Sequence, residues 1–139
     1  MFLESIRTAQ SSPADPSGTT STTLVMMGLA GSITLQGSGR ILIMLSGECG
    51  SGTTGNGTGV QLSYGTGAAP SNGGTLAGTQ VGGLPIFTSL TGVLRNNFAI
   101  QAVVSGLTVG TTYWLDAAVK AVTAGTSTIT NLSLTAIEL

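Results

Sequence analysis

The sequence has 139 residues and a mass of 13.7 kDa, which suits one domain with a single core and leaves no room for two domains of ordinary size. Only 6% of the residues are charged, against roughly a quarter in typical soluble proteins, and 22 positions are glycine. The four basic residues are scattered and histidine is absent, which argues against nucleic-acid binding by phosphate neutralisation and against most catalytic chemistry.

Other functional classes lack the residues that they need. No apolar run approaches the length of about 18 residues that a membrane helix requires, and the first residues lack the pattern of a secretory signal. The segment 50–55 matches G-x-G-x-x-G, but no helix is predicted after it, so we expect a loop and no nucleotide cofactor. The five acidic residues form no local pair, and Cys49 is the single cysteine. We therefore expect no enzyme activity, no metal site and no membrane partner.

Residues 1–22 are predicted to form an extended N-terminal arm. A short apolar patch of Phe2, Leu3 and Ile6 is followed by a polar segment rich in serine, threonine and proline. Such a segment cannot bury enough apolar surface to offset its ordering entropy. We expect a neighbouring chain to hold it in place.

Residues 23–139 are predicted to form an all-β domain, an antiparallel β-sandwich of about eight strands. Segments rich in β-branched residues alternate with glycine-rich turns, and no helical period is sustained. The two longest connections, 47–59 and 65–83, are expected to be loops at the ends of the sandwich. The expected strands are 23–29, 32–36, 40–46, 59–64, 84–89, 97–105, 111–122 and 127–138.

Two of these strands are apolar on both faces. In 41–45 the odd positions are apolar, and so are Leu42 and Met44 between them; residues 24–27 show the same pattern. An antiparallel sandwich normally keeps one wet face, so this pattern indicates burial on both sides. Copies of the chain packing sheet against sheet would explain it. A loop of the same chain covering a central strand is the alternative.

The strand 111–122 places Trp114, Asp116 and Lys120 on the face opposite its apolar one. The two charges are about 13 Å apart along a strand, too far to pair directly. Each could meet an opposite charge across a strand or across a subunit interface, or both could be solvated. The turn before this strand, with Leu107 and then Tyr113, has the layout of a tyrosine corner, which is typical of Greek-key sandwiches.

Several stretches resemble small tailed-bacteriophage virion proteins. They are AVVSGLTVGTTYWLD at 102–116, ITNLSLTAIEL at 129–139, and the shorter segments at 28–34, 38–43 and 64–67. The resemblance covers about residues 24–139. It implies a jelly-roll-like sandwich and a capsid decoration, or cement, protein that forms a homotrimer on the outer surface of the head. It further implies that the protein is made in the host cytoplasm and clamps the major capsid protein.

Under this interpretation the arm contacts the shell or a neighbour through Phe2, Leu3, Ile6 and Arg7. The expected subunit interface comprises Leu42, Met44, Trp114, Asp116 and Lys120. Two alternatives stay open: the receptor-binding head of a phage fibre and a fibronectin-III-like interaction module. The outer loops could also bind a glycan.

Overall fold

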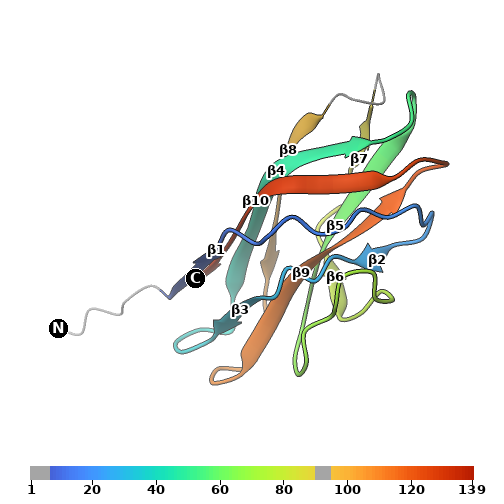
Figure 1. Ribbon diagram of the computed structural model, residues 1–139. Coiled ribbons are helices and arrows are strands. Elements are labelled where there is room, and N and C mark those ends of the chain that lie inside the picture. The colour runs from blue at the N-terminus through green and yellow to red at the C-terminus, as the bar shows by residue number, and fades with distance from the viewer. Residues whose placement is uncertain (1–6, 90–94) are drawn as a thin grey trace.

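The computed structural model describes residues 7–89 and 95–139, which fold into two antiparallel sheets packed face to face (Figure 1). Sheet A has the strand order β1-β10-β4-β8, and sheet B has the order β2-β9-β5-β6, with β3 paired to β9 and β7 paired to β5. The strands are β1 (Thr8–Ser11), β2 (Val25–Met26), β3 (Gly31–Thr34), β4 (Ile41–Ser51), β5 (Gly57–Gly65), β6 (Thr79–Val81), β7 (Ile86–Thr88), β8 (Asn96–Val104), β9 (Thr112–Ala121) and β10 (Ser127–Glu138).

The topology is that of a jelly roll. The short strands β2 and β3 both pair with β9, and β6 and β7 both pair with β5, so each couple fills one strand position. Counted in this way, positions 1-8-3-6 form sheet A and positions 2-7-4-5 form sheet B. Eight positions in two facing four-stranded sheets are the jelly-roll arrangement, which confirms the predicted fold class.

Among the described residues no helix is long and apolar enough to cross a bilayer.

The core lies between the sheets and follows the alternation of the strands. Phe98 and Val104 of β8 face inward, and so do Tyr113, Leu115 and Val119 of β9, as predicted. The tyrosine corner is also confirmed, because the Tyr113 hydroxyl accepts a hydrogen bond from the backbone N–H five residues upstream, at 2.9 Å.

A bulge in β10 keeps both ends of that strand in the core. The register with β4 shifts between Thr130 and Ser133, and Asn131 adopts a left-handed conformation with φ of 53°. Opposite the bulge, a β-carbon on Gly47 would lie 2.7 Å from the Thr130 carbonyl oxygen, so only glycine fits there without movement. The shift lets Ile129 and Leu132, three positions apart, both face inward.

Three strands occupy positions that were predicted to be loops. The predicted loop 47–59 is shorter, because β4 continues to Ser51 and β5 begins at Gly57. The predicted loop 65–83 contains β6. The added ends of β4 and β5 contain glycine and hydroxyl side chains, and β6 has only one apolar residue, so the hydrophobic pattern did not predict them.

The arm is partly a strand of the sandwich. β1 pairs with β10, from Thr8 opposite Ile137 to Ser11 opposite Leu134, and Thr19 exchanges backbone hydrogen bonds with Ser127. The expectation that a neighbouring chain must hold this arm is therefore wrong for residues 8–19, because the edge of sheet A supplies the missing partners. Phe2, Leu3 and Ile6 lie outside the described residues.

Candidate interaction surfaces

The outward faces of the two sheets are the candidate functional surfaces of the described residues. Among residues 7–89 and 95–139 no group of three or more potential metal-ligating side chains gathers at one place. Cys49 is buried, and burial raises the pKa of its thiol to about 11, so the reactive thiolate is scarce at neutral pH. The residues described below are those that the two sheets present outward.

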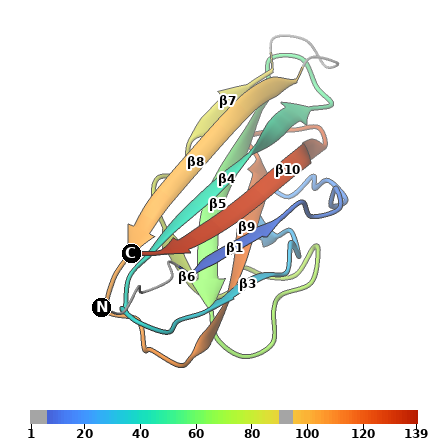
Figure 2. The same ribbon diagram turned by 90° about the vertical axis from the view of Figure 1, so that its left-hand side faces the viewer.

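Sheet A, whose strands lie side by side in Figure 2, has uncharged and partly apolar rows on its outer face near the Ile137 end of β10. The register places Ile137, Leu42 and Val103 side by side across β10, β4 and β8. Leu42 and Ile137 are half-buried, and Val103 is 54% exposed. This row joins three neighbouring strands and carries no polar side chain.

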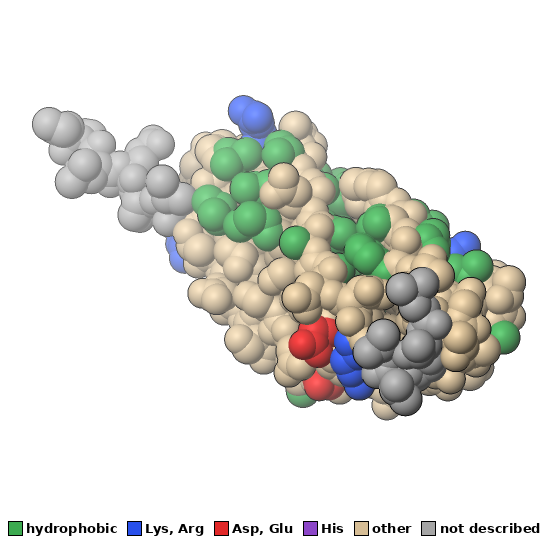
Figure 3. All heavy atoms as spheres, turned by 90° about the horizontal axis from the view of Figure 1, so that it is seen from above, with side chains coloured by type: hydrophobic (Ala, Val, Ile, Leu, Met, Phe, Trp, Pro, Cys, Tyr) green, Lys and Arg blue, Asp and Glu red, His purple; other side chains and the backbone are tan. Residues whose placement is uncertain are grey.

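The next rows on this face are also uncharged. Thr135, Met44 and Gln101 lie side by side in the second row, and a shallow groove of about 480 Å³ runs over them. Leu42 and Met44 therefore point outward, as the two-sided pattern of 41–45 predicted, while Ile41, Ile43 and Leu45 face the core. Figure 3, seen from above, shows hydrophobic side chains in clusters, with a few acidic and basic side chains beside them.

Charged groups near sheet A are used to hold the chain together. At the β10 bulge, the Asn131 backbone N–H donates to the Asp15 carboxylate at 2.8 Å, and the Asn131 side chain donates to Glu48 at 3.0 Å. Arg95 donates to the Thr130 hydroxyl at 2.8 Å. These contacts fix the polar arm and the bulge at one margin of the sheet.

Arg7 and Glu138 lie at the opposite margin. The Glu138 backbone N–H donates to the Arg7 carbonyl at 2.8 Å, which extends the pairing of β1 with β10. The buried Glu138 carboxylate accepts the backbone N–H groups of Gln36, Gly37 and Ser38, with distances between 2.7 and 3.1 Å. These bonds, that from Gly37 foremost, lower the pKa of Glu138. The contact closes the loop between β3 and β4.

Trp114 is covered by its own chain. It is only 6% exposed, and its indole N–H donates to the Thr66 carbonyl at 3.2 Å. The loop 66–78 lies so close to the ring that a β-carbon on Gly65 or Gly78 would overlap it. The prediction of a subunit contact here is corrected, because the ring packs with Met26 and Ala118 inside one copy.

Asp116 is also removed from any subunit contact, since it is 1% exposed. Its carboxylate accepts backbone N–H groups from Gly28 and Leu29 at 2.9 Å and from Ala117 at 2.7 Å. Burial raises the pKa of Asp116, and these three bonds oppose the rise. Gly28 and Ala30 have positive φ, and the chain turns from β2 into β3 at these residues. The carboxylate accepts the backbone N–H groups at this turn in place of a neighbouring strand. The predicted charge contact across an interface is thus replaced by backbone capping within the chain.

Lys120 differs from Trp114 and Asp116, because it is half-buried on the outer face of sheet B. Its aliphatic stem lies near Gly59, as Leu84 and Ile86 do, and a shallow groove of about 580 Å³ opens beside it. Of the three residues predicted on this face of β9, only Lys120 can reach a partner.

The sequence reasoning missed the apolar residues that complete both outer faces. Val103 and Ile137 alternate with the core positions of β8 and β10, so alternation alone predicts that they face outward. In β10 the bulge shifts the alternation, which makes the face of Ile137 harder to assign from the sequence. Leu84 and Ile86, which are 37% and 46% exposed, lie beside glycine-rich segments where no alternation identifies a face.

Comparison with known proteins gives structural neighbours and no sequence relatives. No family model matches the chain, and no curated protein matches it. Similar solved structures include those of infectious bursal disease virus: the Gt strain, at 13% identity and a TM-score of 0.57, and the Gx strain, at 14% identity and a TM-score of 0.58. These matches cover 95% and 96% of this chain, and 33% of each viral chain.

A mutant VP2 protein of the same virus, in derived T=1 particles, matches at 14% identity and a TM-score of 0.57. That match covers 95% of this chain and 31% of VP2. The chain therefore spans about a third of the length of the structures that it resembles. The shared property is the fold. It is the fold of a protein found in virus particles, and not specifically that of a tailed phage.

Proposed function

We propose that this chain is a structural virion protein of the capsid decoration type. It acts through contact rather than catalysis: three copies associate, and the trimer attaches to the major capsid protein on the outer surface of the head. The jelly-roll fold supports a place in the particle, since the structural neighbours are proteins of virus particles. The resemblance of the sequence to small phage virion proteins supports the decoration role.

The outer face of sheet A is the observation that carries the proposal. Leu42, Val103 and Ile137 form an uncharged row over three strands, and Met44 continues it. Four strands of about nine residues cover roughly 600 Å² of flat area. Specific interfaces bury roughly 800 Å² of accessible surface on each partner, so a face of this size suits one subunit contact.

The low charge of the chain agrees with this role. Asp116 and Glu138 are buried, and Asp15, Glu48 and Arg95 hold the arm and the bulge, so few charges remain on the sheet faces. Cores of interfaces are depleted of charged residues because each charge must be desolvated or paired. A neutral sheet can therefore pack against another copy without that cost.

The test of this interface is Leu42→Asp. Leu42 points out of the sandwich and is half-buried, so the monomer should keep its fold. In an assembly the new carboxylate would be buried without a partner, which costs roughly 3–5 kcal/mol and raises the dissociation constant at least about 100-fold. Light scattering should give three times the chain mass for the unmodified protein and the single-chain mass for the variant.

The matched control is Val109→Asp, which places the same charge on a 49% exposed valine in the β8–β9 loop. It should leave the mass and the attachment to purified capsids unchanged. A monomeric unmodified protein would argue against the trimer. A trimer that binds host-cell surface glycans but does not sediment with capsids would favour the receptor-binding alternative.

A further inference from the structure

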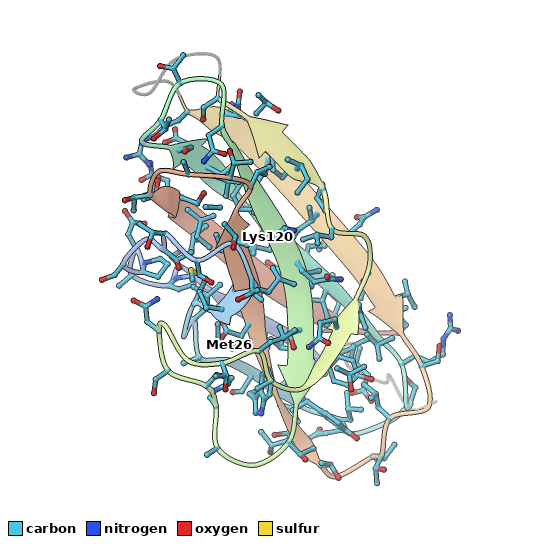
Figure 4. The ribbon with its side chains drawn as sticks, turned by 90° about the vertical axis from the view of Figure 1, so that its right-hand side faces the viewer. Met26 and Lys120 are labelled. Carbon is cyan, nitrogen blue, oxygen red and sulfur yellow. The ribbon has the colours of Figure 1, made fainter. Side chains whose placement is uncertain are left out.

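The groove beside Lys120, which is labelled in Figure 4, is lined by apolar side chains and three threonines, and Lys120 is its one charged residue. On one side of Lys120, across Gly59 of β5, lie Leu84 and Ile86. On the other side, toward β2, lie Leu24 and Leu76. Because Gly59 has no side chain, nothing interrupts the surface between Lys120 and Ile86.

The Lys120 ammonium lacks an acceptor within the part of the chain that the structure describes. No hydrogen bond or ion pair joins it to residues 7–89 or 95–139. A ligand segment that covered this groove would desolvate the ammonium, and the cost is met only if the segment supplies a carboxylate. The groove therefore fits a segment with apolar side chains on either side of one acidic residue.

Residues 1–6 of the chain have this pattern. In an extended segment Phe2, Glu4 and Ile6 share one face, with the carboxylate between two apolar side chains about 6.6 Å away on each side. The other four acidic residues, Asp15, Glu48, Asp116 and Glu138, already accept hydrogen bonds within the chain. Glu4 is the remaining acidic residue of the sequence.

The segment cannot reach the groove of its own copy. Arg7 lies beside Glu138, whose carboxylate binds the loop after β3, and Thr34 at the end of β3 pairs with Thr112 at the start of β9. Lys120 is eight residues further along β9, which is about 26 Å, on the outer face of the other sheet. Glu4 is three positions before Arg7 in the sequence, a span of at most about 11 Å.

We propose that the groove around Lys120 binds residues 1–6 of a second copy of this chain, with the Glu4 carboxylate paired to the Lys120 ammonium. The inference rests on the self-association in the proposed function and adds to it an exchanged segment. Phe2 and Ile6 then cover the leucines and the isoleucine that the sandwich leaves exposed. The arm thereby connects sheet A of one copy to the outer face of sheet B of the next.

Carbodiimide cross-linking tests the contact directly, because Lys120 is the only lysine in the sequence. The reagent joins a carboxylate and an amine that touch into an amide and takes up the water lost. Equal amounts of 15N-labelled and unlabelled protein are mixed, dissociated and reassembled before the reaction. Mass spectrometry should then find Glu4 linked to Lys120, with half of the linked peptide pairs carrying one label of each kind.

Two variants and one control make the result specific. Glu4→Gln and Lys120→Arg should each abolish the link, whereas Glu48→Gln should retain it, because Glu48 lies near the bulge of sheet A. Glu4→Lys should lower the fraction of assembled protein at a given concentration, and combining it with Lys120→Glu should restore that fraction.

The outcomes separate this inference from the proposed function. A trimer that shows no Glu4–Lys120 link, or links Lys120 to another acidic residue, overturns the exchanged segment and leaves the sheet A interface intact. A link found only within single copies also overturns it. A monomer without the link overturns both, and a link in assemblies that are unaffected by Leu42→Asp supports the exchange while removing the sheet A interface.

Discussion

The burial of Trp114 beneath its own loop makes a quantitative prediction for Trp114→Ala. The ring is 6% exposed and fills the space above Gly65 and Gly78. Removing it should cost about 4 kcal/mol, from lost apolar burial and from the cavity that the loop cannot fill. Domains of this size have a free energy of unfolding of about 5–15 kcal/mol, so the variant should fold with much reduced stability.

Urea unfolding measured by far-UV circular dichroism checks this value. With an m-value of about 2 kcal/mol per molar urea, the midpoint should fall by about 2 M. Trp114→Phe keeps most of the apolar contact but loses the hydrogen bond to the Thr66 carbonyl, and should cost about 1–2 kcal/mol. Leu76→Ala, on the exposed side of the same loop, should change stability by less than about 0.5 kcal/mol.

The measurement must be made on dilute, dissociated protein, so that loss of subunit contacts does not enter the midpoint. If Trp114→Ala left the midpoint unchanged and instead dissociated the assembly, the ring would belong to a subunit interface. The reasoning from the loop contacts would then be refuted.

Two buried carboxylates give further predictions. Asp116→Ala leaves three backbone N–H groups without an acceptor and should destabilise the fold by about 3 kcal/mol, with faster amide exchange at Gly28 and Leu29; unchanged exchange there would contradict the capping role. Glu138→Gln removes a carboxylate whose pKa is lower in the folded protein than in the unfolded chain. Glu138 therefore stabilises the fold above its unfolded pKa of about 4.3, and this stabilisation is lost as the pH falls through the folded pKa. The melting temperature of the unmodified protein should exceed that of Glu138→Gln at pH 7, and the gap should close in acid; a gap that persists at low pH would argue against this assignment.

The sequence predicted the parts of the fold that depend on alternation. Phe98 to Val104 and Tyr113 to Ala121 alternate cleanly, so the inner and outer faces of β8 and β9 were assigned correctly. β1 could not be predicted in this way, because Thr8–Ser11 is a polar edge strand whose pairing is made by backbone groups. The interruption between β2 and β3 depends on the Asp116 carboxylate, which is distant in sequence, so no local pattern predicts it.

The candidate surfaces were predicted for one sheet and misjudged for the other. Two apolar faces in 41–45 identified Leu42 and Met44 as outward, and the structure places them there; whether copies meet at them stays a prediction. Alternation also placed Trp114 on the outer face of β9, but the subunit contact expected there was wrong because Gly65 and Gly78 allow a loop of the same chain to lie directly on the ring. Whether a loop packs directly on a side chain depends on tertiary structure. The face of a strand on which a residue lies follows from the alternation of neighbouring residues in the sequence.

The jelly-roll topology also determines when the strands can form during folding. β1 pairs with β10, and the Asp116 carboxylate accepts the N–H of Leu29, which is 87 residues earlier in the chain. Contacts of such long sequence separation require a large loss of chain entropy before they contribute stability, and proteins dominated by them fold in milliseconds to seconds. On the ribosome β1 has no partner in its own chain until β10 has emerged, so the edge of sheet A is the last to close. Refolding after rapid dilution from denaturant should accordingly order β9 and β5 before β1.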